Sequence, residues 1–175
     1  EGLSLVVGLA VLKTLRDAGV QGAGLKWPND VLVGRRKVAG ILLELVGDPA
    51  DVCHVIIGVG INVNMRATSQ VDQLWTSLRL ETGVLVNRSF LATQLSVNID
   101  EYLAIHQKLG FESLRGEWES SNLWQGSADS LHAGADVIDG VVLGIDSQGA
   151  LRLQVGDSEK VFSGGELSLR LRDDT

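Results

Sequence analysis

The sequence predicts an α+β fold, in which a mixed β-sheet is packed by helices and is followed by a small β-barrel. The first observation is periodicity, because apolar residues recur at helical spacing over 4–18 and 89–109 and alternate in short runs between 23 and 63. The second is size, because 175 residues with 45% hydrophobic side chains allow one main core and a small appendage. We predict two domains, 1–125 and 126–175.

The predicted elements begin with a helix over residues 4–18, which Gly19 ends. A strand over 23–27 follows and stops at Pro28. The chain starts at Glu1 rather than Met and enters this helix at once. From that start we expect a fragment whose N-terminal portion has been removed.

Three further strands follow the proline. Residues 31–33 and 37–46 flank a Gly-Arg-Arg tip and predict a β-hairpin, and 54–63 predicts a strand. Because successive side chains point to opposite faces, the last strand has one β-branched apolar face, which we expect to pack on helices. Its other face carries Gly58, Gly60 and Asn62. Two glycines in phase with an amide favour a flat floor for a ligand, since glycine otherwise weakens a strand.

The hairpin strand poses a problem of parity. Lys37 is in phase with Ala39, whereas Gly40 is in phase with Val38. Lys37 and Gly40 therefore cannot both face a ligand on a regular strand. Either Gly40 offers only its backbone, or a β-bulge lies between the two residues.

The middle of the chain is predicted to hold a polar connector and two helices. The connector spans 66–86 and contains Trp75, and the helices span 89–109 and roughly 111–122. Asn87 and Ser89 are the two candidates for the cap of the first of these helices.

The C-terminal segment is predicted to be all β. Short strands alternate there with turns at 147–149 and 156–157. The expected strands cover 135–139, 141–145, 151–155, 160–162 and 167–171. A unit of this size is marginal alone, so we expect it to dock on the first domain.

Composition narrows the function classes. A net charge of −7 and a pI near 4.9 argue against nucleic-acid binding through this chain. No apolar run approaches a membrane span and no secretory signal is present, so we expect a cytoplasmic protein. The single cysteine, Cys53, excludes an internal disulfide and is predicted to be a buried inert thiol. The three histidines lack metal-ligand spacing.

The chemistry that the residues allow is electrostatic and positional. A lysine beside a glycine-rich floor suits an anion such as a phosphate or a carboxylate. No Walker-type loop and no Gly-x-Ser-x-Gly motif occurs, so P-loop and acyl-enzyme mechanisms are not favoured. Asp30 is a candidate Mg²⁺ ligand, although an aspartate after asparagine is also common turn chemistry.

Three ordered blocks carry a resemblance to a known family. They are Lys26-Trp27-Pro28-Asn29-Asp30, Arg36-Lys37-x-Ala39-Gly40-Ile41-Leu42 and Gly58-x-Gly60-Ile61-Asn62, and the chain nears its end with Gly164-Gly165-Glu166-Leu167-Ser168-Leu169-Arg170. Together they resemble the catalytic core and the SH3-like C-terminal domain of biotin protein ligase, whose core is similar to class II aminoacyl-tRNA synthetases.

The resemblance implies a reaction, its cofactors and its partners. Biotin and ATP, with Mg²⁺, would form biotinyl-5′-AMP, and a lysine of the biotin carboxyl carrier protein of acetyl-CoA carboxylase would accept the biotin. Family members can pair sheet edges, so a homodimer is expected. The implied catalytic residue is Lys37. The implied biotin-binding residues are Lys37, Gly40, Gly58 and Gly60, and the implied nucleotide-binding residues are Lys26, Asn29, Asp30, Asn62, Trp75 and Arg170, with Asp30 also the implied metal ligand.

The sequence also departs from the family pattern. The family's Gly-Arg-Gly-Arg-Arg-Gly loop and its biotin-reading Ser/Thr strand are not among these 175 residues. We therefore expect this chain alone to be inactive or nearly so. Two alternatives stay open: a lipoate ligase, and a non-catalytic effector domain of a biotin repressor that senses the adenylate.

Overall fold

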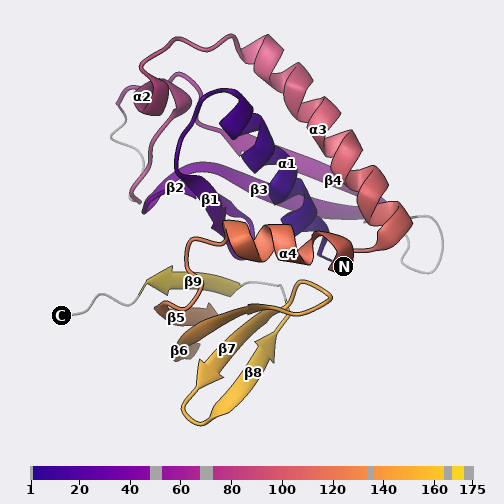
Figure 1. Ribbon diagram of the computed structural model, residues 1–175, viewed down its shortest axis with the longest axis vertical. Helices are drawn as coiled ribbons and strands as arrows, with labels where there is room; N and C mark the ends of the chain where they lie inside the picture. Colours follow the sequence, from indigo (N-terminus) through magenta and orange to yellow (C-terminus); the bar gives the residue numbers. More distant parts are fainter. Residues whose placement is uncertain (1, 48–52, 68–72, 134–135, 164–166, 172–175) are drawn as a thin grey trace.

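The computed structural model describes residues 2–47, 53–67, 73–133, 136–163 and 167–171 (Figure 1). Its first part contains one four-stranded sheet and its helices, and its last part is a five-stranded sheet. The predicted α+β class is confirmed. The named strands pair antiparallel, and the parallel pairings among the described residues are two isolated bridges.

The first part begins with helix α1, Leu3–Asp17, which precedes the sheet. The sheet has the order β1-β2-β3-β4, and three helices follow it. The strands are β1 (Ala23–Lys26), β2 (Asp30–Val33), β3 (Arg36–Gly47) and β4 (Cys53–Ile61), and the helices are α2 (Leu78–Thr82), α3 (Arg88–Leu109) and α4 (Glu112–Ser121).

The second sheet has the order β8-β7-β6-β5-β9 and lies below α4 in the view of Figure 1. Its strands are β5 (Ala128–Ala133), β6 (Asp136–Ile145), β7 (Leu151–Val155), β8 (Ser158–Phe162) and β9 (Leu167–Leu171). It docks on the first part as predicted: the indole Nε1 of the buried Trp27 donates to the carbonyl of Gly149 at 3.0 Å.

The four-stranded sheet has two unlike faces. One face is covered by α1 and α3, and its central row pairs Ala39 with Ile61 and Ile41 with Val59. Helix α1 enters that core with most of its length buried, because apolar residues surround it on nearly every side. The other face is exposed over β3 and β4, where Leu42 is 60% and Ile56 is 52% exposed.

Several local predictions need correction. Strand β5 was not predicted, because Asp, Ser and Ala dominate it; ladder bonds to both β6 and β9 override that weak propensity. Strand β6 is continuous where a break at Gly140 was expected. A Cβ at Gly140 would lie 2.7 Å from the carbonyl oxygen of Gln154, so this glycine permits the close approach of β7.

The connector contains the short helix α2, which was also not predicted. The Ser77 side chain accepts from the backbone N–H of Leu80, and Gly83 ends the helix at φ 74°. Five residues are too few for periodicity to reveal. In α3 the cap is Asn87, whose side chain accepts from the Phe90 N–H at 3.1 Å, rather than Ser89.

The outer end of β4 also differs from prediction. Cys53 is exposed, not buried, because it pairs with Gly47 at the far end of the β3–β4 ladder. Val55, on the face predicted to pack on helices, is 39% exposed for the same reason. Further along that face, Ile57, Val59 and Ile61 pack against the core as expected.

Candidate functional site

A β-bulge in β3 brings Lys37 and Gly40 to the same side of the sheet. Val31 pairs with Ala39 but Leu32 pairs with Lys37, so Val38 is the extra residue. A Cβ placed on Gly40 would lie 3.0 Å from Cε and 3.1 Å from Nζ of Lys37. Of the two alternatives left by the sequence, the bulge is the observed one, and it lets the lysine lie across the glycine.

Lys37 belongs to a cluster of two ammonium groups around one carboxylate. Lys37 Nζ lies 2.6 Å from Asp30 Oδ1, and Lys26 Nζ lies 3.4 Å from Asp30 Oδ2. The side chains of Lys26 and Asp30 are each 13% exposed, and that of Lys37 is 28% exposed. Water therefore screens these charges only in part. Two cations and one anion leave a net positive charge, which suits a second anion.

Lys26 is the most enclosed cation of the cluster. Its ammonium lies 4.9 Å above the centre of the Trp124 ring, a cation–π contact. Burial lowers the pKa of Lys26 below its usual value, the Asp30 carboxylate opposes that shift, and the charges of Lys37 and Arg170 add to it. Arg170, on β9 of the second sheet, thus lies close enough to act on the same group.

The glycines lie on the open face of the same sheet. Asp30 pairs with Gly40, and Gly40 pairs with Gly60, so one cross-strand row joins the carboxylate to two glycines. Gly58 pairs with Leu42, which is 60% exposed. A Cβ at Gly60 would find its nearest neighbour 3.9 Å away, at the Gly40 carbonyl oxygen. Backbone packing therefore does not require glycine there, which agrees with a floor kept flat for a ligand.

The two predicted asparagines bond to the backbone around this floor. Asn29 Nδ2 donates to the Ile41 carbonyl at 2.8 Å, and the Ile41 N–H donates back to the Asn29 carbonyl at 2.9 Å. Asn62 Nδ2 donates to the Thr76 carbonyl at 3.0 Å. These side-chain hydrogen bonds thus fix the ends of the strands that carry the cluster.

Trp75 is brought next to Lys37 by the backbone. The Lys37 N–H donates to the Leu74 carbonyl, and the Thr76 N–H donates to the Lys37 carbonyl, each at 2.9 Å. These bonds form a short parallel bridge between Lys37 and Trp75. The structure therefore brings together Lys26, Asp30, Lys37, Gly40 and Gly60. Trp75 joins them through its backbone bridge to Lys37, and Arg170 lies near enough to affect the pKa of Lys26.

Sequence reasoning missed two residues next to this cluster, Trp124 and Asp129. Trp124 is 9% exposed and Asp129 is 0% exposed. Neither lies in a recognisable motif, and both come from the junction of the two sheets. The one available signal in the sequence was Trp124 itself, a large aromatic residue that does not fit the apolar periodicity of a predicted helix or strand.

A resident metal site is not evident in the described part of the chain. No group of three or more His, Cys, Asp or Glu side chains is arranged there to hold an ion. Asp30 offers a single carboxylate, and both of its oxygens face ammonium groups. A Mg²⁺ ion at Asp30 would need most of its ligands from water and from phosphates.

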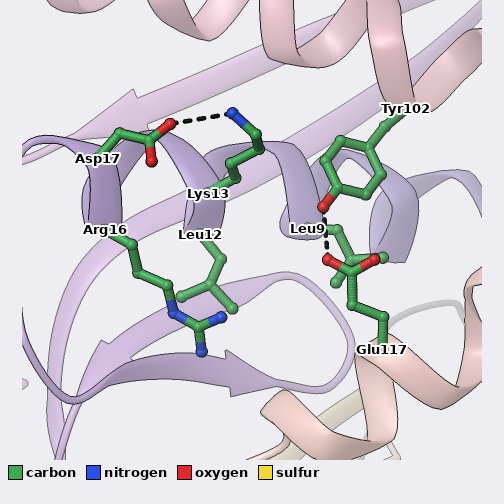
Figure 2. A pocket seen from close by; sticks show the side chains of 7 residues that line it. All are labelled: Leu9, Leu12, Lys13, Arg16, Asp17, Tyr102 and Glu117. Carbon is green, nitrogen blue, oxygen red and sulfur yellow. Dashed lines mark hydrogen bonds and ion pairs between the residues drawn. The ribbon is translucent and has the colours of Figure 1, made fainter.

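A separate cavity of about 240 Å³ lies on the helical side of the sheet, between α1, α3 and α4 (Figure 2). Its polar groups pair with one another: Lys13 lies 3.0 Å from Asp17, and the Tyr102 hydroxyl donates to Glu117 at 2.5 Å. Burial, assisted by Glu117, raises the pKa of Tyr102. This self-paired cavity lacks the net charge of the lysine cluster.

Among the described residues, no helix is both long and apolar enough to cross a membrane.

Two segments of the chain are similar to protein ligases. Residues 1–62 match the biotin/lipoate A/B protein ligase family, and residues 131–170 match the biotin protein ligase C-terminal domain. The chain belongs to the biotin protein ligase family.

Curated relatives agree with this membership. The biotin--[acetyl-CoA-carboxylase] ligase of Paracoccus denitrificans is 34% identical over 93% of this chain and 73% of its own. The corresponding Mycobacterium tuberculosis ligase is 39% identical over 94% of this chain and 61% of its own. The Escherichia coli bifunctional ligase/repressor BirA is 37% identical over 97% of this chain. This chain spans 53% of BirA, about half its length.

Solved structures also agree. The biotin protein ligase of Aquifex aeolicus superimposes with a TM-score of 0.89 at 32% identity, covering 98% of this chain and 75% of its own. Its complex with biotin and ATP superimposes with a TM-score of 0.88. The structural relatives therefore include a protein seen with both small molecules.

Proposed function

We propose that the protein carrying these residues joins biotin to a lysine of the biotin carboxyl carrier protein of acetyl-CoA carboxylase through biotinyl-5′-AMP. In the first step the biotin carboxylate attacks the α-phosphorus of ATP, and pyrophosphate leaves. In the second step the amine of the carrier lysine attacks the acyl carbon, AMP leaves and an amide forms. The observation that carries the proposal is the Lys37–Asp30–Lys26 cluster beside the Gly40–Gly60 row.

Lys37 has the central role in this proposal. The first step brings a carboxylate and a phosphate together, so two anions must be held at bonding distance. The Lys37 ammonium, lying across Gly40, faces the open floor where both would meet. It would offset their repulsion and the negative charge that develops on phosphorus.

The remaining residues are assigned by position. Gly40, Gly58 and Gly60 would support biotin, whereas Trp75, Lys26 and Arg170 would face the nucleotide. Asn29 and Asn62 would hold the strand ends through the backbone bonds described above. Mg²⁺ would reach Asp30 with the phosphates of ATP, and pairing of sheet edges would give a homodimer.

Exchange of labelled pyrophosphate into ATP, dependent on biotin, tests the proposal. In a protein that carries these residues together with a Gly-Arg-rich loop, we expect Lys37→Ala to reduce exchange about 100-fold or more. Lys108→Ala, an exposed lysine at the end of α3, is the matched control and should exchange normally. Full exchange by Lys37→Ala would show that Lys37 does not promote adenylate formation, whereas absence of exchange by the unmodified protein would favour a non-catalytic, adenylate-sensing effector domain.

The 175 residues alone provide a second test. Since they lack the Gly-Arg-rich loop, we expect little exchange from this chain by itself. Substantial biotin-dependent exchange would show that the floor and the lysine cluster are sufficient. Replacing biotin with lipoate in the same assay separates a biotin ligase from a lipoate ligase.

A further inference from the structure

Asp129 is a buried acid at the junction of the two sheets. It lies on β5 and is 0% exposed. Its Oδ2 lies 2.9 Å from Ser127 Oγ, and its Oδ1 has no hydrogen-bond partner among the described residues. A buried carboxylate normally has hydrogen bonds to both oxygens, because an unsatisfied charged oxygen is costly. The surroundings of Asp129 therefore suit a neutral acid better than an anion.

The hydrogen bonds of Ser127 depend on the charge of Asp129. Ser127 Oγ lies 2.6 Å from the Trp124 carbonyl oxygen and 2.9 Å from Asp129 Oδ2. The hydroxyl has one proton, and the carbonyl can only accept. Ser127 Oγ therefore donates to Asp129 Oδ2 when the acid is ionised, and the Trp124 carbonyl keeps the Ser127 N–H at 3.1 Å. When Asp129 is protonated, it can donate to Ser127 while the hydroxyl donates to Trp124.

Burial also favours the neutral form of Asp129. It raises the pKa of Asp129 to about 6, against the hydrogen bond from Ser127 and the positive charge of Lys26, which both lower it. Lys26 on β1 is the charged group shown to act on Asp129. On the paired strands β6 and β9, the register partners Gly140 and Leu171 are uncharged. Asp129 is thus poised to exchange its proton near neutral pH.

The acid is linked to the lysine cluster through Trp124. The carbonyl of Trp124 accepts from Ser127, and the ring of Trp124 lies 4.9 Å from the Lys26 ammonium. Lys26 in turn contacts Asp30, the partner of Lys37. A change in the position of Asp129 therefore affects Lys26 through this chain of contacts, and a change in its charge affects Lys26 electrostatically.

We propose that Asp129 is a positioning residue for the nucleotide side of the site. Its carboxyl holds Ser127, which contacts Trp124 beneath Lys26. Its ionisation adds a second negative charge that competes with an anionic ligand for Lys26. By linkage, an anion bound at Lys26 favours the protonated acid, so binding takes up a proton. This inference rests on the proposed function, because that function supplies the anion.

The first experiment needs no ligand. The ¹³C resonance of the Asp129 carboxyl is followed by NMR from pH 3 to pH 9 in the 175-residue chain and in Ser127→Ala. Because Ser127 donates to the ionised carboxylate and so lowers the pKa of Asp129, loss of the hydroxyl should shift the Asp129 titration to higher pH. A shift to lower pH, or no shift, overturns the proposal.

The second experiment measures proton uptake. Calorimetric titration with biotinyl-5′-AMP, whose phosphate does not titrate near pH 6, is repeated at pH 6.5 in buffers of different ionisation enthalpy. The titrated protein carries these residues together with a Gly-Arg-rich loop. We expect an uptake of roughly half a proton per ligand for this unmodified protein and none for Asp129→Asn. Asp157→Asn, in an exposed turn, is the matched control and should keep the uptake.

The outcomes separate the two proposals. Equal proton uptake by the unmodified protein and Asp129→Asn overturns the positioning role even though the adenylate binds. Absence of adenylate binding by the protein that carries these residues together with a Gly-Arg-rich loop counts against the proposed function, and the Ser127→Ala titration then decides the inference alone. If Asp129→Asn does not fold, Ser127→Ala also decides it.

Discussion

The two faces of the β1–β4 sheet show how one short segment can serve two purposes. The helix-covered face buries Ala39 and Ile41 against α1 and is almost wholly apolar. The open face has Asp30, Gly40 and Gly60 in one row, with Lys37 laid across it. Alternate residues of the same strands therefore stabilise the fold and form the candidate site. Substitutions on the first face should change stability, and those on the second should change activity.

Leu12→Ala tests the covered face. Leu12 lies in α1 and is 1% exposed, so its truncation removes buried apolar surface and leaves a cavity. We expect the free energy of unfolding to fall by about 2–5 kcal/mol. Urea denaturation followed by circular dichroism measures this loss, and Leu109→Ala, 61% exposed at the end of α3, is the control. A loss below about 0.5 kcal/mol would show that α1 is not the central core helix.

Asp129 sharpens the comparison, because it is a buried acid without the ion pairs of the open face. Its pKa of about 6 in the fold exceeds the ordinary 3.8, so its stabilising contribution is complete below pH 3.8 and is lost as pH rises through about 6. The difference of about two pKa units corresponds to about 3 kcal/mol.

The measurement compares stability at several pH values. We expect the unmodified chain to lose up to about 3 kcal/mol relative to Asp129→Asn between pH 4 and pH 7. Urea denaturation at each pH gives this difference, with Asp157→Asn as the control. Parallel stability curves for the unmodified chain and Asp129→Asn would show that Asp129 titrates normally.

Much of this arrangement could be predicted from the sequence, since it depends on local pattern. Alternation in 54–63 identified the apolar and the glycine-bearing faces of β4, and helical spacing identified α1 and α3. The conflict in phase between Lys37 and Gly40 led to the bulge as one of two alternatives, because a strand has a period of two. The family motifs then indicated which face would bind a ligand.

What could not be predicted depends on contacts between distant segments. Strand β5 has weak strand propensity and forms because two neighbours pair with it. The position of Trp124 beneath Lys26 and the burial of Asp129 follow from how the second sheet docks. No local pattern encodes that docking. The division at residues 125 and 126 stays a prediction, as do the ligand roles of the site residues.

Gly40→Val tests the open face. The added side chain would begin 3.0 Å from Lys37 Cε, so it must displace the lysine, while valine itself suits a β-strand. We expect a loss of about 100-fold in biotin-dependent exchange by a protein containing these residues, with stability nearly unchanged. Gly116→Ala, in α4, is the control and should keep full activity, because an added Cβ there would meet no atom within 4 Å. Unchanged exchange in Gly40→Val would remove Lys37 from the proposed mechanism.

Trp27→Phe tests whether docking of the second sheet couples the stability of the covered face to ligand binding on the open face. Trp27 follows Lys26 in the chain and is buried in the core, and its indole donates to the Gly149 carbonyl at 3.0 Å. Phenylalanine keeps most of the apolar contact but leaves a buried carbonyl without its donor, so we expect a loss of about 1 kcal/mol in unfolding free energy. If docking also fixes Trp124 beneath Lys26, ATP should bind more weakly to the variant, whereas biotin binding should stay the same because its floor lies on β3 and β4. Calorimetric titration with each molecule distinguishes these effects, and equal weakening of both would mean that Trp27 supports the whole sheet rather than its nucleotide side.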